Sequence, residues 1–228
     1  MATHVVKVEN VRILRSGELQ SGSLWIENGK IVDPQARFWR LQSEAEHAPD
    51  EVVDGRGYIV APGFIDLQLN GGFGFDFSDP AIEKENIEFV AQRLVSTGVT
   101  AFCPTLVSSS ATIYRSTLPK FPRTKDGHVH GAANMLGVHL EGPFINVERK
   151  GAHDASVLDV PRHGIDSLNE RYGSLEDVAI VTLAPELPGA SEAIRSLRDQ
   201  GIIVSAGHSQ ANISTAISAV NAGVTMLT

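Results

Sequence analysis

Two residues that could do chemistry, His139 and Glu141, end an apolar run that begins at Met135. If this run is a strand, alternation puts both side chains on one face and the apolar residues on the other. A buried carboxylate without a partner is costly, so we expect a cation, a metal ion or a proton beside Glu141. Glu141 could instead cap the loop amides of the Gly-Pro turn that follows, and His139 is also consistent with a core histidine.

A second apolar run, residues 202–206, is followed by Gly207 and then by His208. A histidine in this position is often structural. Here it shares its place after an apolar run with Glu141, and a histidine with a carboxylate is common zinc ligation. We therefore interpret His208 as a metal ligand, and Ser209 could cap the helix that follows.

Three further polar residues, Asp66, Gln68 and Asn70, share one face of the strand predicted at 58–69, and glycines follow them. Glycines there would allow a backbone to approach a ligand closely, although a Gly-rich stretch by itself indicates a tight loop. His128 and His130 have a spacing that could chelate a metal. They precede a strand instead of ending one, so we do not assign them a site. Cys103 is interpreted as a packed strand residue, not a nucleophile.

The first sixty residues have the pattern of a small β layer. Apolar runs flank Asn28-Gly29, which is a strong signal for a two-residue hairpin turn. The polar stretch from Gln35 to Asp50 is expected to be an exposed loop. These strands are too few for a large sheet, so the β layer should be attached to something larger.

From Tyr58 onward, predicted strands alternate with predicted helices, which is typical of parallel βαβ units. We expect a helix from Asp79 as N-cap, with Pro80 at its first position, to about Thr97. Six strands are predicted, at 58–69, 99–106, 135–141, 178–183, 202–206 and 224–227, and the further helices at 111–118, 167–172, 190–200 and 210–222. Six strands fit either an open doubly wound sheet or the front part of a longer barrel, and both collect functional groups at the carboxyl ends of their strands.

Composition narrows the class of protein. The 228 residues carry a formal net charge of -8, which argues against a nucleic-acid or anionic-membrane surface. No apolar run approaches the roughly 18 residues of a membrane span, and the first residues do not follow a signal-peptide pattern. A single cysteine excludes an internal disulfide and a cysteine-based zinc cluster. We expect a cytoplasmic protein.

Several stretches together resemble the amidohydrolase superfamily and, within it, the N-acetylglucosamine-6-phosphate deacetylase family. The resemblance begins at Val53-Asp54-Gly55 and runs to the end of the chain. The matching stretches are 61–66, 66–74, 98–105, 139–144, 151–153, 183–186 and 206–209. It implies an α/β fold: a (β/α)8 TIM-type barrel of the amidohydrolase type, incomplete here with about six strands, and a small N-terminal β-sandwich portion. Residues 1–57 would form the sandwich portion and residues 58–228 the barrel portion.

The resemblance also implies roles for particular residues. Glu141 and His208 match metal ligands, while Ala152 (through its backbone) and His153 (through its imidazole) match substrate contacts. His153 would also be the catalytic donor to the oxyanion. Gln68 and Asn70 stand where many superfamily members carry two histidines. We therefore expect one divalent metal ion, zinc before cobalt or iron, with Gln68 near it.

The implied reaction is hydrolysis of the N-acetyl group of N-acetylglucosamine 6-phosphate to give glucosamine 6-phosphate. A third histidine ligand and an aspartate acid/base have no counterpart in these 228 residues, so the chain resembles the N-terminal portion of such an enzyme. We expect it to be inactive alone, and the full-length form to be a homodimer. The alternatives are a non-catalytic fragment or short isoform that at most binds a partner subunit, and an amidohydrolase that acts on another amide.

Overall fold

The computed structural model describes residues 3–40, 48–124 and 131–228 in two compact units that divide between Pro62 and Gly63. The pair His128 and His130, left unassigned above, lies outside the described residues. Among the described residues, no helix combines the length and the apolar character needed to cross a membrane.

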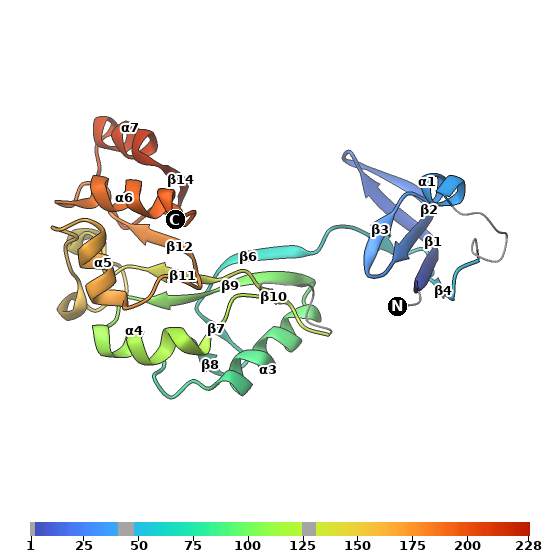
Figure 1. The fold of residues 1–228 in the computed structure, drawn as a ribbon, viewed down its shortest axis with the longest axis horizontal. Coiled ribbons are helices and arrows are strands. Elements are labelled where there is room, and N and C mark those ends of the chain that lie inside the picture. The colour runs from blue at the N-terminus through green and yellow to red at the C-terminus, as the bar shows by residue number, and fades with distance from the viewer. Residues whose placement is uncertain (1–2, 41–47, 125–130) are drawn as a thin grey trace. The chain divides into compact units, whose positions relative to one another are not determined.

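The first unit is built on one five-stranded sheet, coloured blue to cyan in Figure 1. Strands β3, β2, β1 and β4 lie in that order, and β5 also pairs with β1. The predicted hairpin is confirmed: β2 and β3 pair across Asn28-Gly29, whose φ angles of 51° and 76° suit a tight hairpin turn. Bounds are β1 Val5–Arg15, β2 Glu18–Glu27, β3 Lys30–Val32, α1 Pro34–Arg40, β4 Glu51–Asp54 and β5 Ile59–Val60.

The second unit is a half-barrel of parallel strands. Strands β6, β9, β11, β12, β13 and β14 are neighbours in that order, and every pairing between them is parallel. A doubly wound sheet would reverse its order at a switch point, and these strands follow chain order throughout. All six predicted strands are found, as β6 Phe64–Leu69, β9 Val99–Val107, β11 Val138–Glu141, β12 Val178–Leu183, β13 Ile203–Ala206 and β14 Val224–Leu227. Two are shorter than predicted: the start of 58–69 is the separate strand β5, which pairs with β1, and the start of 135–141 falls in the short strand β10 (Asn134–Met135), which pairs with β9.

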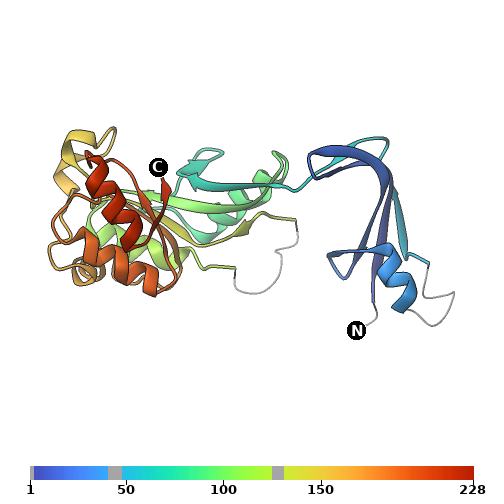
Figure 2. The same ribbon diagram turned by 90° about the horizontal axis from the view of Figure 1, so that it is seen from above.

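Helices follow the outer side of this curved sheet, as the two views in Figures 1 and 2 show. The outward side chains Leu106, Leu140 and Val181 are fully buried in one apolar cluster with residues of these helices. The helices are α3 Lys84–Val95, α4 Ala111–Thr117, α5 Ile165–Tyr172, α6 Ala190–Asp199 and α7 Ile213–Ala222. Shorter elements are β7 Gly71–Gly72, β8 Phe75–Asp76, η1 Leu118–Lys120, β10 Asn134–Met135, η2 Val147–Arg149 and η3 Ala155–Val157.

Three local predictions were wrong. Helix α3 begins at Lys84, not after Asp79, because the Asp79 carboxylate accepts from Ala81 N–H in a turn. Asn86 Oδ1 then accepts the Glu83 N–H where the helix starts. Helix α7 is capped by Asn212, whose side chain accepts from Thr215 N–H.

Ser209, the predicted cap of α7, does not cap the helix, and its hydroxyl donates to the Glu186 carboxylate instead. The predicted loop 35–50 contains most of helix α1, whose partly apolar sequence PQARFWR was not recognised as helical. Residues 41–47 of that stretch lie outside the described residues.

Candidate metal centre

Glu141 is the last residue of β11, whose four residues are all buried. Because β11 lies between β9 and β12, Glu141 pairs in register with Val107 on one side and Thr182 on the other. The backbone directly after Glu141 is fixed by two tyrosines, since Tyr114 and Tyr172 both donate to the Gly142 carbonyl, at 3.1 and 2.9 Å. The carboxylate therefore sits at a fixed strand end, as the alternation in the sequence predicted.

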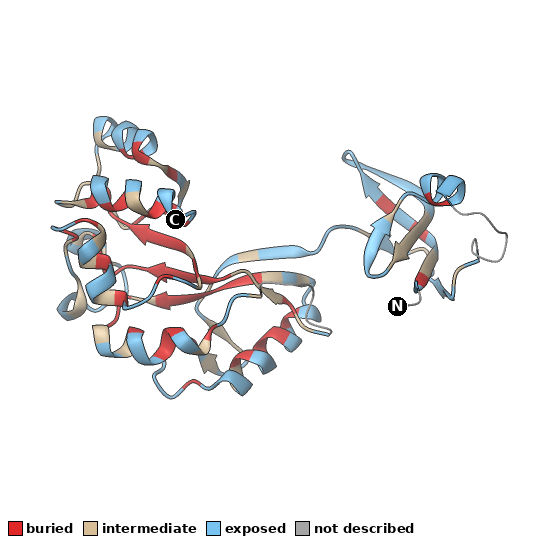
Figure 3. Cartoon of the chain, in the orientation of Figure 1, coloured by how far each residue is buried: buried red, intermediate tan, exposed pale blue. Residues whose placement is uncertain are grey.

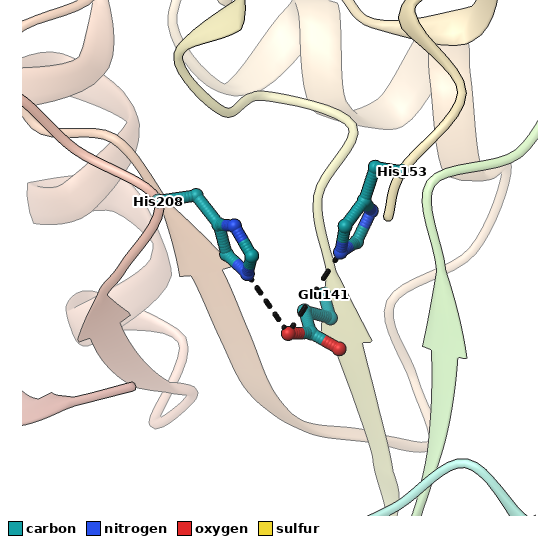
Figure 4. A group of neighbouring side chains, drawn as sticks. All are labelled: Glu141, His153 and His208. Atoms are coloured by element: carbon teal, nitrogen blue, oxygen red, sulfur yellow. Dashed lines mark hydrogen bonds and ion pairs between the residues drawn. The ribbon is translucent and has the colours of Figure 1, made fainter. Parts of the chain in front are cut away.

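Two imidazoles converge on this carboxylate, from the loop after β11 and from the residues after β13 (Figure 4). His208 Nε2 lies 3.0 Å from Glu141 Oε1, and His153 Nε2 lies 3.8 Å from the same oxygen. Among the described residues, Glu141, His153 and His208 form a group that could hold a metal ion, with their ligand atoms all within 4.8 Å of one another. The side chains are mostly buried, at 8%, 6% and 21% relative exposure respectively.

Burial alone would raise the pKa of Glu141, but the neighbouring imidazoles of His153 and His208 lower it to about 2. The carboxyl group is thus an anion near neutral pH, and its partners are the two histidines. The alternative that Glu141 caps amides of the Gly-Pro turn receives no support from its contacts, which run to the imidazoles.

The partner of each Nδ1 atom assigns opposite tautomers to the two histidines. His208 Nδ1 lies 2.8 Å from the Arg149 carbonyl, which can only accept, so Nδ1 carries the proton and Nε2 has the lone pair. His153 Nδ1 accepts from the Ser108 backbone N–H at 3.3 Å, so its proton is on Nε2. Ser108 Oγ also lies 2.7 Å from His153 Nδ1. His208 is arranged as a ligand and His153 as a hydrogen-bond donor.

The contact between His208 and Glu141 therefore calls for a positive charge. In the tautomer that Arg149 selects, a lone pair on Nε2 faces a carboxylate oxygen at 3.0 Å, and two acceptors repel. Either a second proton on His208 or a cation between the two atoms resolves this. A neutral imidazole whose other nitrogen donates to a carbonyl is the usual arrangement of a histidine metal ligand, so the residues fit a divalent metal ion.

His139, left open between a functional and a core role, has partners at both ring nitrogens. Nδ1 donates to the Leu67 carbonyl at 2.9 Å, and Thr182 Oγ1 lies 2.7 Å from Nε2. Burial is the main cause that lowers the pKa of His139, against the Leu67 contact and Glu141, so it is neutral. His139 is a satisfied core histidine on the inner face of the half-barrel.

The other residues singled out in the sequence lie as follows. Gln68 is on β6, with an exposed side chain, and its backbone N–H donates to Asp66 Oδ1 at 3.1 Å. Ala152 is exposed in the loop before His153. Their predicted roles beside a metal and a substrate remain predictions. Cys103 is buried in β9, as a packed strand residue should be.

Sequence reasoning missed the residues that orient the histidines. Ser108 follows β9 directly, and the Arg149 carbonyl ends the short helix η2, so neither carried a recognisable signal. Glu186 did carry one, because it is a carboxylate just beyond the end of β12 in the way that Glu141 ends β11. It also lies in the matching stretch 183–186.

A half-barrel of parallel strands with a carboxylate and histidines at its strand ends defines a class, the α/β proteins with a candidate metal centre. Within that class the chain resembles N-acetylglucosamine-6-phosphate deacetylases. It is 46% identical to the enzyme of that name from Bos taurus over 226 residues, 98% of this chain and 54% of that protein. No family model matches the chain.

Solved structures agree with this resemblance. The deacetylase of the same name from Pasteurella multocida matches with a TM-score of 0.77 and 25% identity, over 98% of this chain and 56% of that one. The one from Thermotoga maritima matches with a TM-score of 0.71 and 30% identity, over 96% and 53%. The resemblance inferred from the sequence is confirmed, and the chain spans about half the length of the curated relatives it matches.

Proposed function

We propose that this chain is the metal-holding part of an N-acetylglucosamine-6-phosphate deacetylase. Such a hydrolase removes acetate from N-acetylglucosamine 6-phosphate and gives glucosamine 6-phosphate, a step of amino-sugar metabolism. The observation that carries the proposal is the 3.0 Å approach of His208 Nε2 to Glu141 Oε1, which calls for a positive charge, and a cation held by both atoms supplies it. The similarity to enzymes of this name over 98% of the chain supports the substrate.

Glu141 and His208 would hold one divalent ion, for which we propose zinc, with cobalt or iron as alternatives. A carboxylate and an imidazole nitrogen are a ligand pair that zinc accepts. When bound, such an ion polarises an amide carbonyl and lowers the pKa of water towards neutrality. Gln68, at the end of the first strand of the half-barrel, is proposed to lie near the ion without replacing either ligand.

His153 is proposed as the catalytic donor and, with the backbone of Ala152, as a contact to the sugar. Its Nε2–H is fixed by the Ser108 backbone amide, which occupies Nδ1. A donor held in place before the reaction can stabilise the oxyanion that develops on the N-acetyl carbonyl, without reorganising at that moment. This assignment makes the two imidazoles unequal: replacing His208 removes a ligand, whereas replacing His153 removes a donor.

The domain organisation, the location and the oligomeric state also belong to the proposal. Residues 1–57 would be a small β-sandwich portion and residues 58–228 part of a (β/α)8 barrel of the amidohydrolase type. Support for this barrel comes from the chain-order parallel strands. A cytoplasmic location is part of the proposal. A homodimer is proposed from the resemblance alone.

The test is acetate release from N-acetylglucosamine 6-phosphate with added zinc or cobalt. We expect the 228-residue chain alone to release none, since it spans 54% of the bovine relative. In a chimera, this chain would replace the matched 226 residues of that relative, and we expect turnover that Glu141→Ala and His208→Ala abolish.

Acetate release by the 228-residue chain alone would contradict the proposal that it is only part of the enzyme. A chimera whose turnover survives both substitutions would overturn the site. A folded chimera that binds the metal yet releases no acetate would favour the alternative, a non-catalytic fragment that at most binds a partner subunit.

A further inference from the structure

Glu186, just beyond the end of β12, accepts three hydrogen bonds through its carboxylate. Asn146 Nδ2 donates to Oε1 at 2.9 Å and Gln210 N–H to the same oxygen at 2.7 Å, while Ser209 Oγ donates to Oε2 at 2.6 Å. Partial burial would raise the pKa of Glu186, but these donors hold it below its ordinary value. Asn146, Glu186, Ser209 and Gln210 are called the Glu186 clamp below.

The clamp holds the backbone around His208. Ser209 and Gln210 directly follow His208, whose φ of 48° lies in the left-handed region that a residue with a Cβ atom seldom adopts. The Asn146 N–H donates to the His208 carbonyl at 3.0 Å. A strained backbone persists when its surroundings hold it in place, and the clamp contacts the His208 carbonyl and the two residues that follow it.

The clamp also reaches the imidazole ring of His208. Asn146 Oδ1 accepts the Glu148 N–H at 2.9 Å and so begins helix η2. The last residue of η2 is Arg149, whose carbonyl accepts from His208 Nδ1. Glu186 thus holds the Asn146 side chain, Asn146 begins helix η2, and the Arg149 carbonyl at the end of η2 accepts the Nδ1 proton of His208.

We propose that Glu186 is a positioning residue that fixes both the backbone and the ring of His208, so that Nε2 points at Glu141. Its carboxylate ties the residues after His208 to the loop after β11, and neither path requires it to touch a metal or a substrate. The metal-binding consequence rests on the proposed function, but the orientation of the ring does not.

The first test is zinc affinity of the purified chain, measured by competition with a chromophoric chelator. Loss of a group that orients a metal ligand typically costs about 10- to 100-fold in metal affinity, and we expect a loss of that size for Glu186→Ala. Glu186→Gln keeps Oε1 as an acceptor for Asn146 and Gln210, so its loss should be smaller. The exposed Glu85 on α3 provides the matched control, because Glu85→Gln should leave the affinity unchanged.

The second test follows the ring protons of the metal-free chain by NMR with 15N-labelled histidine at pH 8. Nδ1 of His208 should stay protonated through its bond to the Arg149 carbonyl, whether or not Nε2 also carries a proton, and Glu186→Ala should weaken this Nδ1–H signal. His153 is an internal control, because its partner Ser108 lies outside the clamp. Its Nε2-protonated signal should persist in every variant that is folded.

An unchanged His208 signal and unchanged zinc affinity in folded Glu186→Ala would overturn the proposal. If wild type binds no zinc, the metal part of the proposed function fails, while the NMR result still decides the role of Glu186. If Glu186→Ala does not fold, Glu186→Gln, which removes the charge of the clamp, and Ser209→Ala, which removes one hydrogen bond, should lower zinc affinity several-fold and perturb His208. The absence of both effects would again overturn the proposal.

Discussion

The middle strands and the edge strands of the half-barrel have the same parallel pairing but opposite burial (Figure 3). All residues of β11 are buried and five of six in β12, whereas β6 has none that is buried. Phe64 on β6 is 71% exposed, and Leu227 on β14 and Ile213 on α7 are each 80% exposed. An apolar strand becomes core here only where a strand lies on each side and a helix covers its outer face.

This difference explains where the candidate centre can work. Glu141 ends a middle strand, so its carboxylate is held by neighbours on both sides and sits in a low-dielectric setting that strengthens its interaction with a cation. His208 follows β13, one strand from the edge, and depends on the Glu186 clamp for its orientation. The buried middle strands thus hold the anionic Glu141, and loop contacts orient the second ligand, His208.

A matched pair of leucine truncations tests the comparison most strongly. Leu140 on β11 is fully buried, so Leu140→Ala should lower the free energy of unfolding by about 2–5 kcal/mol. Leu67 on β6 is 42% exposed, and Leu67→Ala should cost under about 1 kcal/mol. Urea unfolding followed by far-ultraviolet circular dichroism measures both, and equal losses would contradict the contrast between middle and edge.

The thiol of Cys103 on β9 reports whether the middle is sealed in solution. Burial, opposed in part by Arg123 and reinforced by Asp66, raises its pKa to about 11. The sign is clear: a raised pKa lowers the thiolate fraction at pH 8, and the thiolate is the reactive form. We expect labelling by a disulfide reagent to be about 100-fold slower or more than in the urea-unfolded chain. Labelling at the unfolded rate would show that the middle strands open readily.

The smallest effect is expected at the edge. Ile217 on α7 is 57% exposed, so Ile217→Lys should change the free energy of unfolding by at most about 0.5 kcal/mol. It should also reduce self-association in sedimentation velocity, because exposed apolar surface favours association. Ile194 on α6 is fully buried, and Ile194→Lys should prevent folding. A stability loss of several kcal/mol at Ile217 would mean that the edge is packed.

The architecture could be predicted from the sequence because strands and helices alternate in a regular hydrophobic pattern. All six barrel-type strands were predicted, and the strand-end positions of Glu141 and His208 followed from alternation and motif. Helix starts were less predictable, since Asp79 and Ser209 are both plausible caps that are instead bound in local turns or to Glu186. The tautomers of His153 and His208 could not be predicted. They depend on which loop brings a carbonyl or an amide to each imidazole, and tertiary contacts decide this.

The most direct test of the central claim is the stoichiometry and affinity of zinc bound to the purified 228-residue chain and to three variants. We predict about one zinc ion per wild-type chain, its loss in Glu141→Gln and His208→Ala, and its retention in His153→Ala, because His153 is held as a donor. Wild-type chain without zinc, or zinc retained after both Glu141→Gln and His208→Ala, would contradict the assignment of Glu141 and His208 as the ligands of this centre.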